Sequence, residues 1–142
     1  MTVTIFAFIG ALIFTVLGLW HLYWASGGSL AKDIAIPEIN NKPAFVPSNA
    51  ATVVVGVALL CFAFLIAATA GFVTVPVSSL VLSRLSFSLA FVLLARAIGE
   101  FRLVGFFKRV RGTRFARLDT LVYSPLCLFL AFIVFFVGSN HA

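Results

Sequence analysis

Three long stretches of this chain, residues 1–31, 43–83 and 120–142, contain no Lys, Arg, Asp or Glu. A water-soluble domain of 142 residues cannot bury that much apolar chain, because its surface needs polar residues. The composition agrees, since 63% of the residues are hydrophobic and 10% are charged. Soluble domains are about half apolar and about a quarter charged. The sequence therefore predicts an integral membrane protein.

Four segments are long enough to cross a bilayer, which requires about 20 mostly apolar residues. Gly71 and Pro76 divide the longest uncharged run into two of them, joined by a tight turn. The predicted fold class is all-α: a polytopic membrane protein whose residues 1–142 form a single four-helix transmembrane bundle. The predicted spans are residues 3–24, 48–70, 77–99 and 118–138.

Local signals refine the helix ends. Gly27 and Gly28 are suited to ending the first helix. Pro125 lies in the early turns of the fourth helix, where it predicts at most a kink. Residues 100–111 keep helix-forming side chains, so we expect the third helix to extend into the cytoplasm or onto the membrane interface.

The basic residues outside the spans lie in only two loops. Lys32 and Lys42 are in the first loop, and six more are in the basic loop of residues 100–117. The N-terminus, the turn at 71–76 and the C-terminal tail have none. By the positive-inside rule, both basic loops are expected in the cytoplasm and both termini on the outside.

Small residues at four-residue spacing predict close helix packing, which in lipid replaces hydrophobic burial as the basis of association. Such rows occur in three of the four spans. Their members are Ala7, Ala11 and Thr15; Ala63, Ala67 and Gly71; and Ser79, Ser83, Ala95 and Gly99. The seventeen Phe residues are expected to fill the core or face lipid.

Ionisable residues within a span are costly and are therefore candidates for function. Arg96 and Glu100 are four apart, so they share a helix face and can pair. At 1.5 Å per residue, His21 and Arg96 both lie about 27–29 Å from the outer ends of their helices. Arg84 is expected to extend to the outer headgroups.

Because His21 and Arg96 lie at the same depth in the membrane, we expect a polar pocket at the cytoplasmic ends of helices one, three and four. This pocket is predicted to bind a small ligand or a lipid headgroup. Arg96 and Arg102 would anchor an anion, Glu100 would orient Arg96, and His21 and Tyr123 would donate hydrogen bonds. An aromatic interfacial belt with a helix-end ion pair explains the same residues without a ligand. The predicted site comprises His21, Tyr23, Arg96, Glu100, Arg102, Asp119 and Tyr123.

Two other functions remain open: an accessory subunit of a larger membrane complex, and a proton or ion path through His21 and Glu100. The ion path is the weaker hypothesis, because a path requires polar groups across the whole thickness of the membrane and these lie at one depth only. Cys61 and Cys127 have no disulfide or metal-type spacing, and no catalytic motif occurs. The sequence therefore indicates no catalytic residue, metal site or particular cofactor, and enzymatic activity is not favoured.

The expected partners are membrane lipids, with a protein partner left open and nucleic acid not expected. The basic residues crowd next to the spans, where anionic headgroups are the nearer partner. The candidates for headgroup contact are Lys108, Arg109, Arg111, Arg114 and Arg117.

Two segments resemble a family of small four-span bacterial membrane proteins of unknown function. They are LWHLYWASGG at residues 19–28 and RAIGEFRLVGFFKRVRGTRFARLDTLVYSPLC at residues 96–127. The resemblance implies a four-helix protein of the bacterial inner membrane and supplies no activity. The family often has Asp where this chain has Glu100. The motif positions include His21, Tyr23, Trp24, Gly27, Gly28, Arg96, Gly99, Glu100, Arg102, Arg117, Asp119, Tyr123, Ser124 and Pro125.

Overall fold

The computed structural model describes residues 1–40 and 42–141 and contains four helices long and apolar enough to cross a membrane. This confirms the predicted all-α, four-helix membrane fold. The helices are α1 (Thr2–Ala25), α2 (Asn49–Thr69), α3 (Ser79–Ile98) and a continuous helical segment, Arg114–Ser139. That segment comprises α4 (Arg114–Leu118), a π-helical turn (Asp119–Tyr123) and α5 (Ser124–Ser139).

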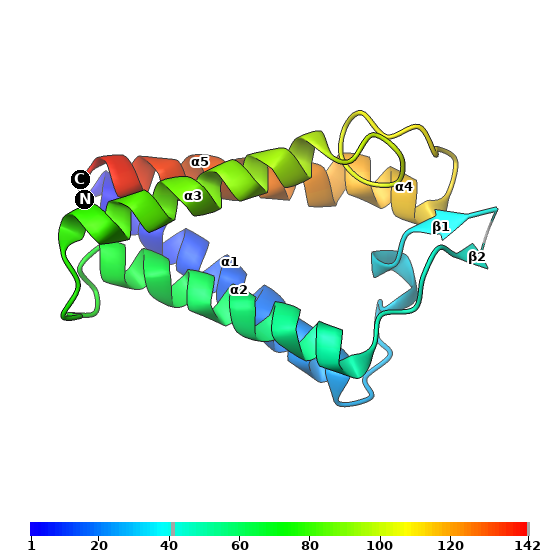
Figure 1. The fold of residues 1–142 in the computed structure, drawn as a ribbon, viewed down its shortest axis with the longest axis horizontal. Helices are drawn as coiled ribbons and strands as arrows, with labels where there is room; N and C mark the ends of the chain where they lie inside the picture. The colour runs from blue at the N-terminus through cyan, green and yellow to red at the C-terminus, as the bar shows by residue number, and fades with distance from the viewer. Residues whose placement is uncertain (41, 142) are drawn as a thin grey trace.

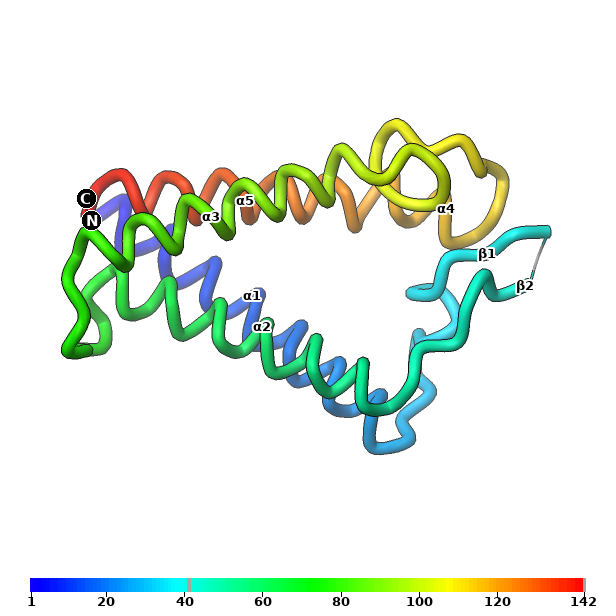
Figure 2. The backbone as a smooth tube through the Cα atoms, in the orientation of Figure 1, coloured from blue at the N-terminus to red at the C-terminus, as the bar shows by residue number. Residues whose placement is uncertain are grey.

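The helices form two pairs, α1 with α2 and α3 with α5, which converge near the chain termini and splay apart at the other end (Figure 1). The backbone trace shows the same wedge, with the loop between α1 and α2 crossing its open end (Figure 2). That loop contains a 3-10 turn (Asp33–Ala35) and two short strands, β1 (Glu38–Ile39) and β2 (Lys42–Pro43). The strands pair antiparallel, with Glu38 opposite Pro43.

The converging end of the wedge contains the apolar core. Buried side chains from α1, α2, α3 and α5 form this core, and Thr69 and Ser86 form a buried hydroxyl pair 3.2 Å apart between α2 and α3. Large apolar residues elsewhere stay exposed, as expected for surfaces that face lipid. The largest fully buried apolar side chains are Phe14, Ile66, Leu130, Ile133, Val134 and Val137.

Glycines set the closest helix contacts, and this corrects the predicted packing of α1. A Cβ on Gly18 would lie 3.0 Å from the carbonyl oxygen of Gly56 on α2, and a Cβ on Gly10 would lie 2.8 Å from Ile133 on α5. The buried face of α1 is thus Ala7, Gly10, Phe14 and Gly18, and the predicted row at Ala11 and Thr15 is only partly buried. Glycine permits a closer backbone approach than alanine, so it determines which face packs.

The ends of α1, α2 and α3 lie within two residues of the predicted ends, whereas the fourth span starts four residues earlier, at Arg114. Thr113 explains that start, because its side chain accepts a hydrogen bond from the Ala116 N–H at 3.0 Å and caps the helix. Ser48 and Ser78 cap α2 and α3 in the same way. Gly27 follows the end of α1 in a left-handed conformation, as predicted.

The expected extension of the third helix is wrong. α3 ends at Ile98, and Gly99 adopts φ +91°, which a helix cannot continue. Residues 99–113 form a non-helical loop, drawn in yellow in Figure 1, that folds back over the end of α3. The Phe106 N–H donates to the Ala97 carbonyl at 2.9 Å and fixes this return.

Candidate ligand-binding site

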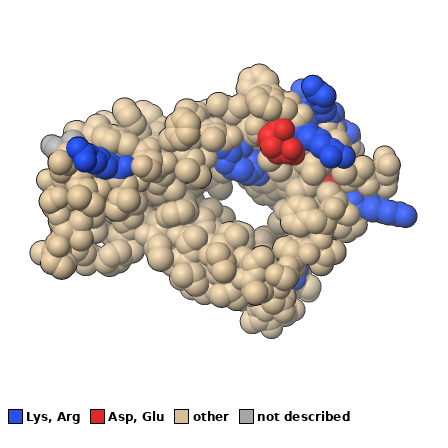
Figure 3. Space-filling model, viewed as in Figure 1, with Lys and Arg blue, Asp and Glu red and all other residues tan. Residues whose placement is uncertain are grey.

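A cavity of about 630 Å³ lies between the two helix pairs at the open end of the wedge. Figure 3 shows the hollow, which separates the α3–α5 pair from the α1–α2 pair. Residues of α1, α2, α3, the loops and the fourth span all contribute to its wall. The wall comprises Leu17, Trp20, His21, Trp24, Ala31, Ala35, Pro37, Phe45, Val55, Arg96, Val104, Phe115 and Tyr123.

Arg96 supplies the positive charge of this wall from the last turn of α3. Its Nη2 donates to Oδ1 of Asp119 at 2.9 Å. Its Nη1 is buried and has no hydrogen-bond partner within residues 1–40 and 42–141. A buried donor without a partner costs free energy, so this N–H group is left to be satisfied by an acceptor from outside the described chain.

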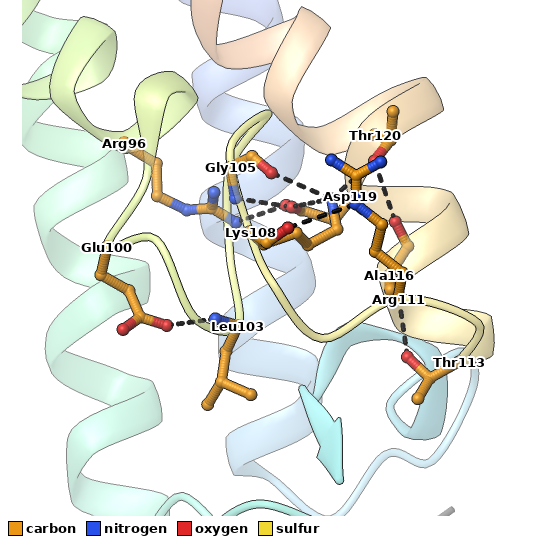
Figure 4. Close-up of polar contacts among 10 residues, drawn as sticks. All are labelled: Arg96, Glu100, Leu103, Gly105, Lys108, Arg111, Thr113, Ala116, Asp119 and Thr120. Atoms are coloured by element: carbon orange, nitrogen blue, oxygen red, sulfur yellow. Dashed lines mark hydrogen bonds and ion pairs between the residues drawn. The ribbon is translucent and has the colours of Figure 1, made fainter.

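Asp119 is completely buried and is the acceptor around which the loop after α3 is organised (Figure 4). Its Oδ2 accepts from Lys108 Nζ at 3.0 Å and from the Gly105 N–H at 2.7 Å. Lys108 is 2% exposed, and its ammonium also donates to the Gly105 carbonyl and to Thr120 Oγ1. Each of its three N–H bonds therefore has a protein acceptor, so the ammonium is satisfied.

The loop after α3 brings the Gly105 N–H to Asp119 because Gly99 and Gly105 lie in close contact. Gly99 and Gly105 have φ values of +91° and +89°. A Cβ on Gly105 would overlap the Ile98 carbonyl oxygen, and a Cβ on Gly99 would overlap the Val104 carbonyl oxygen. Only residues without a side chain fit here, which explains both glycines in the sequence around Arg96.

Asp119 also opens the π-helical turn that precedes Pro125. The Ser124 N–H bonds to the Asp119 carbonyl, five residues back, and Pro125 has no N–H to offer. The sequence predicts at most a kink at Pro125, and the structure has a π-helical turn just before this residue. Such insertions are frequent at functional sites.

His21 and the two tryptophans form the opposite wall, on α1. The His21 Nδ1 donates to the Leu17 carbonyl at 2.8 Å, so in the neutral ring Nε2 is left as an acceptor. Its ring packs against Trp24 with centroids 5.0 Å apart. Trp20 and Trp24 are the only tryptophans in the chain, and both line the cavity.

Tyr123 closes the cavity toward the loop between α1 and α2. Its hydroxyl donates to the Ile34 carbonyl at 3.1 Å, and its ring packs near Phe115. A smaller cavity of about 280 Å³ shares five lining residues with this one: His21, Trp24, Ala35, Phe45 and Val55. The hydrogen bond of Tyr123 thus attaches the α1–α2 loop to the fourth span at the wall of the cavity.

Comparison with protein families provides one match: residues 14–134 fit a family described as a protein of unknown function, DUF3995. The chain belongs to the DUF3995 family. Searches of curated proteins and of solved structures found no match.

The region that matches DUF3995 includes every residue of the cavity wall. Of the residues predicted for the site, the structure brings His21, Arg96 and Tyr123 together on that wall, while Asp119 lies behind it as the partner of Arg96. Tyr23 is exposed and packs over Gly28 instead.

The predicted pairing of Arg96 with Glu100 is wrong. Glu100 lies beyond the end of α3, where the chain has left the helix, so the two side chains no longer share a face. Its carboxylate instead accepts from the Leu103 N–H (Figure 4). Arg102 is exposed and is not part of the cavity wall, which leaves Arg96 as the only predicted anion anchor there.

The structure also reassigns Lys108, which was grouped with the headgroup-binding residues. Its ammonium is buried against Asp119, because an ionised carboxylate inside a span needs cationic partners. The sequence contained an indication of this contact, because Asp119 directly precedes an uncharged membrane-spanning run and a carboxylate there requires a cationic partner. Trp20 and Phe115 were also missed, since aromatic residues near a membrane surface are usual without any ligand.

Within residues 1–40 and 42–141, no group of three or more His, Cys, Asp or Glu residues is arranged to hold a metal ion. What the wall offers is a guanidinium N–H, an imidazole and a phenol among aromatic and aliphatic side chains. This combination can bind an acidic head and shelter an apolar body.

Proposed function

We propose that this DUF3995 protein binds an amphiphilic molecule whose carboxylate or phosphate head contacts Arg96 and whose apolar part occupies the cavity between the helix pairs. The charge balance of the Arg96 cluster carries this proposal. Arg96 and Lys108 share a single carboxylate, that of Asp119, so the hydrogen-bonded cluster keeps one formal positive charge. An anion held in the cavity beside the Arg96 side chain would neutralise it.

The rest of the wall favours a ligand with an apolar body. Leu17, Val55, Phe45 and Phe115 supply aliphatic and aromatic surface, and polar groups are few. The cavity volume of about 630 Å³ lies within the roughly 300–1,000 Å³ of small-molecule sites. His21 and Tyr123 lie on the same wall and can select the head by hydrogen bonding.

The shape of the wedge supports entry from the bilayer. The space-filling view is open between the helix pairs (Figure 3). In a membrane such an opening faces acyl chains, so an amphiphile can enter sideways. Closure at the other end by the core residues Phe14, Ile66 and Ile133 argues against a continuous polar path.

We further propose that the open end of the wedge faces the cytoplasm of a bacterium, with the protein in the inner membrane and both termini outside. The eight basic residues of the two loops support this orientation. An S139C variant with Cys61 and Cys127 replaced by Ala should react with a membrane-impermeant maleimide in intact spheroplasts. Labelling only after lysis would reverse the orientation.

Native mass spectrometry of the gently extracted protein tests the ligand. Wild-type protein should retain an acidic amphiphile, and R96Q should lose it. R84Q is the matched control, because Arg84 is an exposed arginine of the same helix outside the cavity wall. A bare wild-type chain, or equal retention in both variants, would overturn the proposal, and a bound second polypeptide would favour an accessory subunit.

A further inference from the structure

A separate cavity, of about 400 Å³, lies where the loop after α3 meets the start of the fourth span. None of its lining residues belongs to the Arg96 cavity. Three basic residues line it, Lys108, Arg111 and Arg117, together with Thr120 and the apolar side chains of Phe106 and Leu121. Among the described residues, no Asp or Glu lines it.

Two of its guanidinium groups are available to a ligand. Lys108 donates all its N–H bonds to protein acceptors, and Thr120 both accepts from Lys108 and donates to the Ala116 carbonyl. Arg111 uses only Nε, which donates to the Lys108 carbonyl at 3.3 Å. Its terminal nitrogens, and the whole guanidinium of Arg117, have no partner within the part of the chain that the structure describes.

The backbone brings these two arginines to one cavity. Arg111 is followed by Gly112, which has a φ of +89°, and Thr113 then caps α4. Arg117 lies in the last turn of α4, so its side chain returns to the loop that carries Arg111. Two guanidinium groups at one cavity are suited to a tetrahedral oxyanion, because each can donate two parallel hydrogen bonds.

The surroundings distinguish a phosphate on a lipid from a phosphate in solution. Leu121, which lines the cavity, is 68% exposed on the first turns of the fourth span. Apolar side chains of this exposure next to unpaired arginines are suited to the boundary between headgroups and acyl chains. Asp119 does not repel an anion here, because Arg96 and Lys108 neutralise its charge.

We propose that Arg111 and Arg117 bind the phosphate of an anionic phospholipid at this cavity, with Phe106 and Leu121 against its glycerol and acyl region. This site is separate from the Arg96 cavity and does not depend on the function proposed for it. The proposal also reduces the set of basic residues expected to contact headgroups. Arg109 lies outside the cavity, and Arg114 is paired with Asp33 at 3.6 Å.

Native mass spectrometry with added dioctanoyl phosphatidic acid counts the bound lipids. The R111Q/R117Q variant should bind one lipid fewer than wild type, with about tenfold weaker overall retention at limiting lipid. The matched control is R102Q/R109Q, which removes the same charge from exposed positions of the same loop. It should bind as wild type does, and dioctanoyl phosphatidylcholine should not fill the site.

Three results would overturn the proposal: no lipid lost in R111Q/R117Q, equal loss in both double variants, or equal binding of phosphatidylcholine. If millimolar inorganic phosphate displaces the bound phosphatidic acid, the cavity is an anion site, and its assignment to a lipid is overturned. R96Q tests the other cavity independently, because it should lose a different bound lipid and leave this one. Circular dichroism and gel filtration establish that each variant is folded.

Discussion

Arg96 and Asp119 are 23 residues apart in the chain, and their side chains meet at 2.9 Å between the end of α3 and the π-helical turn of the fourth span. This ion pair joins the two halves of the α3–α5 hairpin at the open end of the wedge. Arg96 also lines the cavity. The same contact thus stabilises the fold and positions the proposed anion anchor.

Replacing Asp119 by Asn should destabilise the protein strongly. Arg96 and Lys108 would then be left near each other without a carboxylate, and breaking a buried ion pair in this way costs ~3–5 kcal/mol. Thermal unfolding in detergent, followed by circular dichroism, measures the loss. D33N is the control, because its ion pair with Arg114 is exposed and its removal should change stability little. Equal effects of the two substitutions would contradict the central role of Asp119.

Removing Lys108 in the D119N background should restore part of the stability. The D119N/K108M protein has one buried cation fewer to leave unpaired, so it should be ~1–3 kcal/mol more stable than D119N alone. Unfolding of wild type, D119N, K108M and D119N/K108M forms a complete thermodynamic cycle. Additive destabilisation would show that the two charges do not interact in this way.

Gly105→Ala should disrupt the loop far more than Gly112→Ala. Both glycines have φ +89°, so both substitutions incur the backbone cost of ~1–2 kcal/mol. At Gly105 the new Cβ would also overlap the Ile98 carbonyl, whereas at Gly112 there is open space. The comparison separates crowding from backbone strain in the same melting experiment. Similar melting temperatures for the two variants would contradict the close approach of Gly99 and Gly105.

Tyr123→Phe should loosen the loop between α1 and α2 while leaving the helices folded. The lost hydrogen bond to the Ile34 carbonyl is worth about 0.5–1.5 kcal/mol. Hydrogen–deuterium exchange should accelerate at residues 26–40 and stay unchanged within α2. Unchanged exchange in that loop would mean that the phenol does not attach it to the fourth span.

The four helices could be predicted from hydropathy because each span must bury its backbone hydrogen bonds within lipid. The closest helix contacts could not, since they depend on Gly10, Gly18 and Gly56 and on the particular side chains that these glycines meet. Small residues at regular spacing are common in apolar helices, and spacing alone does not reveal which row makes contact.

The candidate site was only partly visible in the sequence for a related reason. Equal depth brought His21 and Arg96 into one hypothesis, and both line the cavity. The four-residue spacing of Arg96 and Glu100 led to the wrong prediction that they pair, because Gly99 ends the helix between them. The true partner of Arg96, Asp119, belongs to another helix, and only the folded chain reveals such a contact.

Quenching of the two tryptophans tests the central claim most directly, because Trp20 and Trp24 both line the cavity. In detergent micelles, 9,10-dibromostearate should quench their fluorescence saturably, and its methyl ester, which lacks the charge, should not. R96Q should weaken the acid's binding at least about tenfold, the effect of losing one charge-assisted hydrogen bond, while R84Q binds as wild type does. Equal quenching by acid and ester, or equal affinity in R96Q and R84Q, would contradict the account.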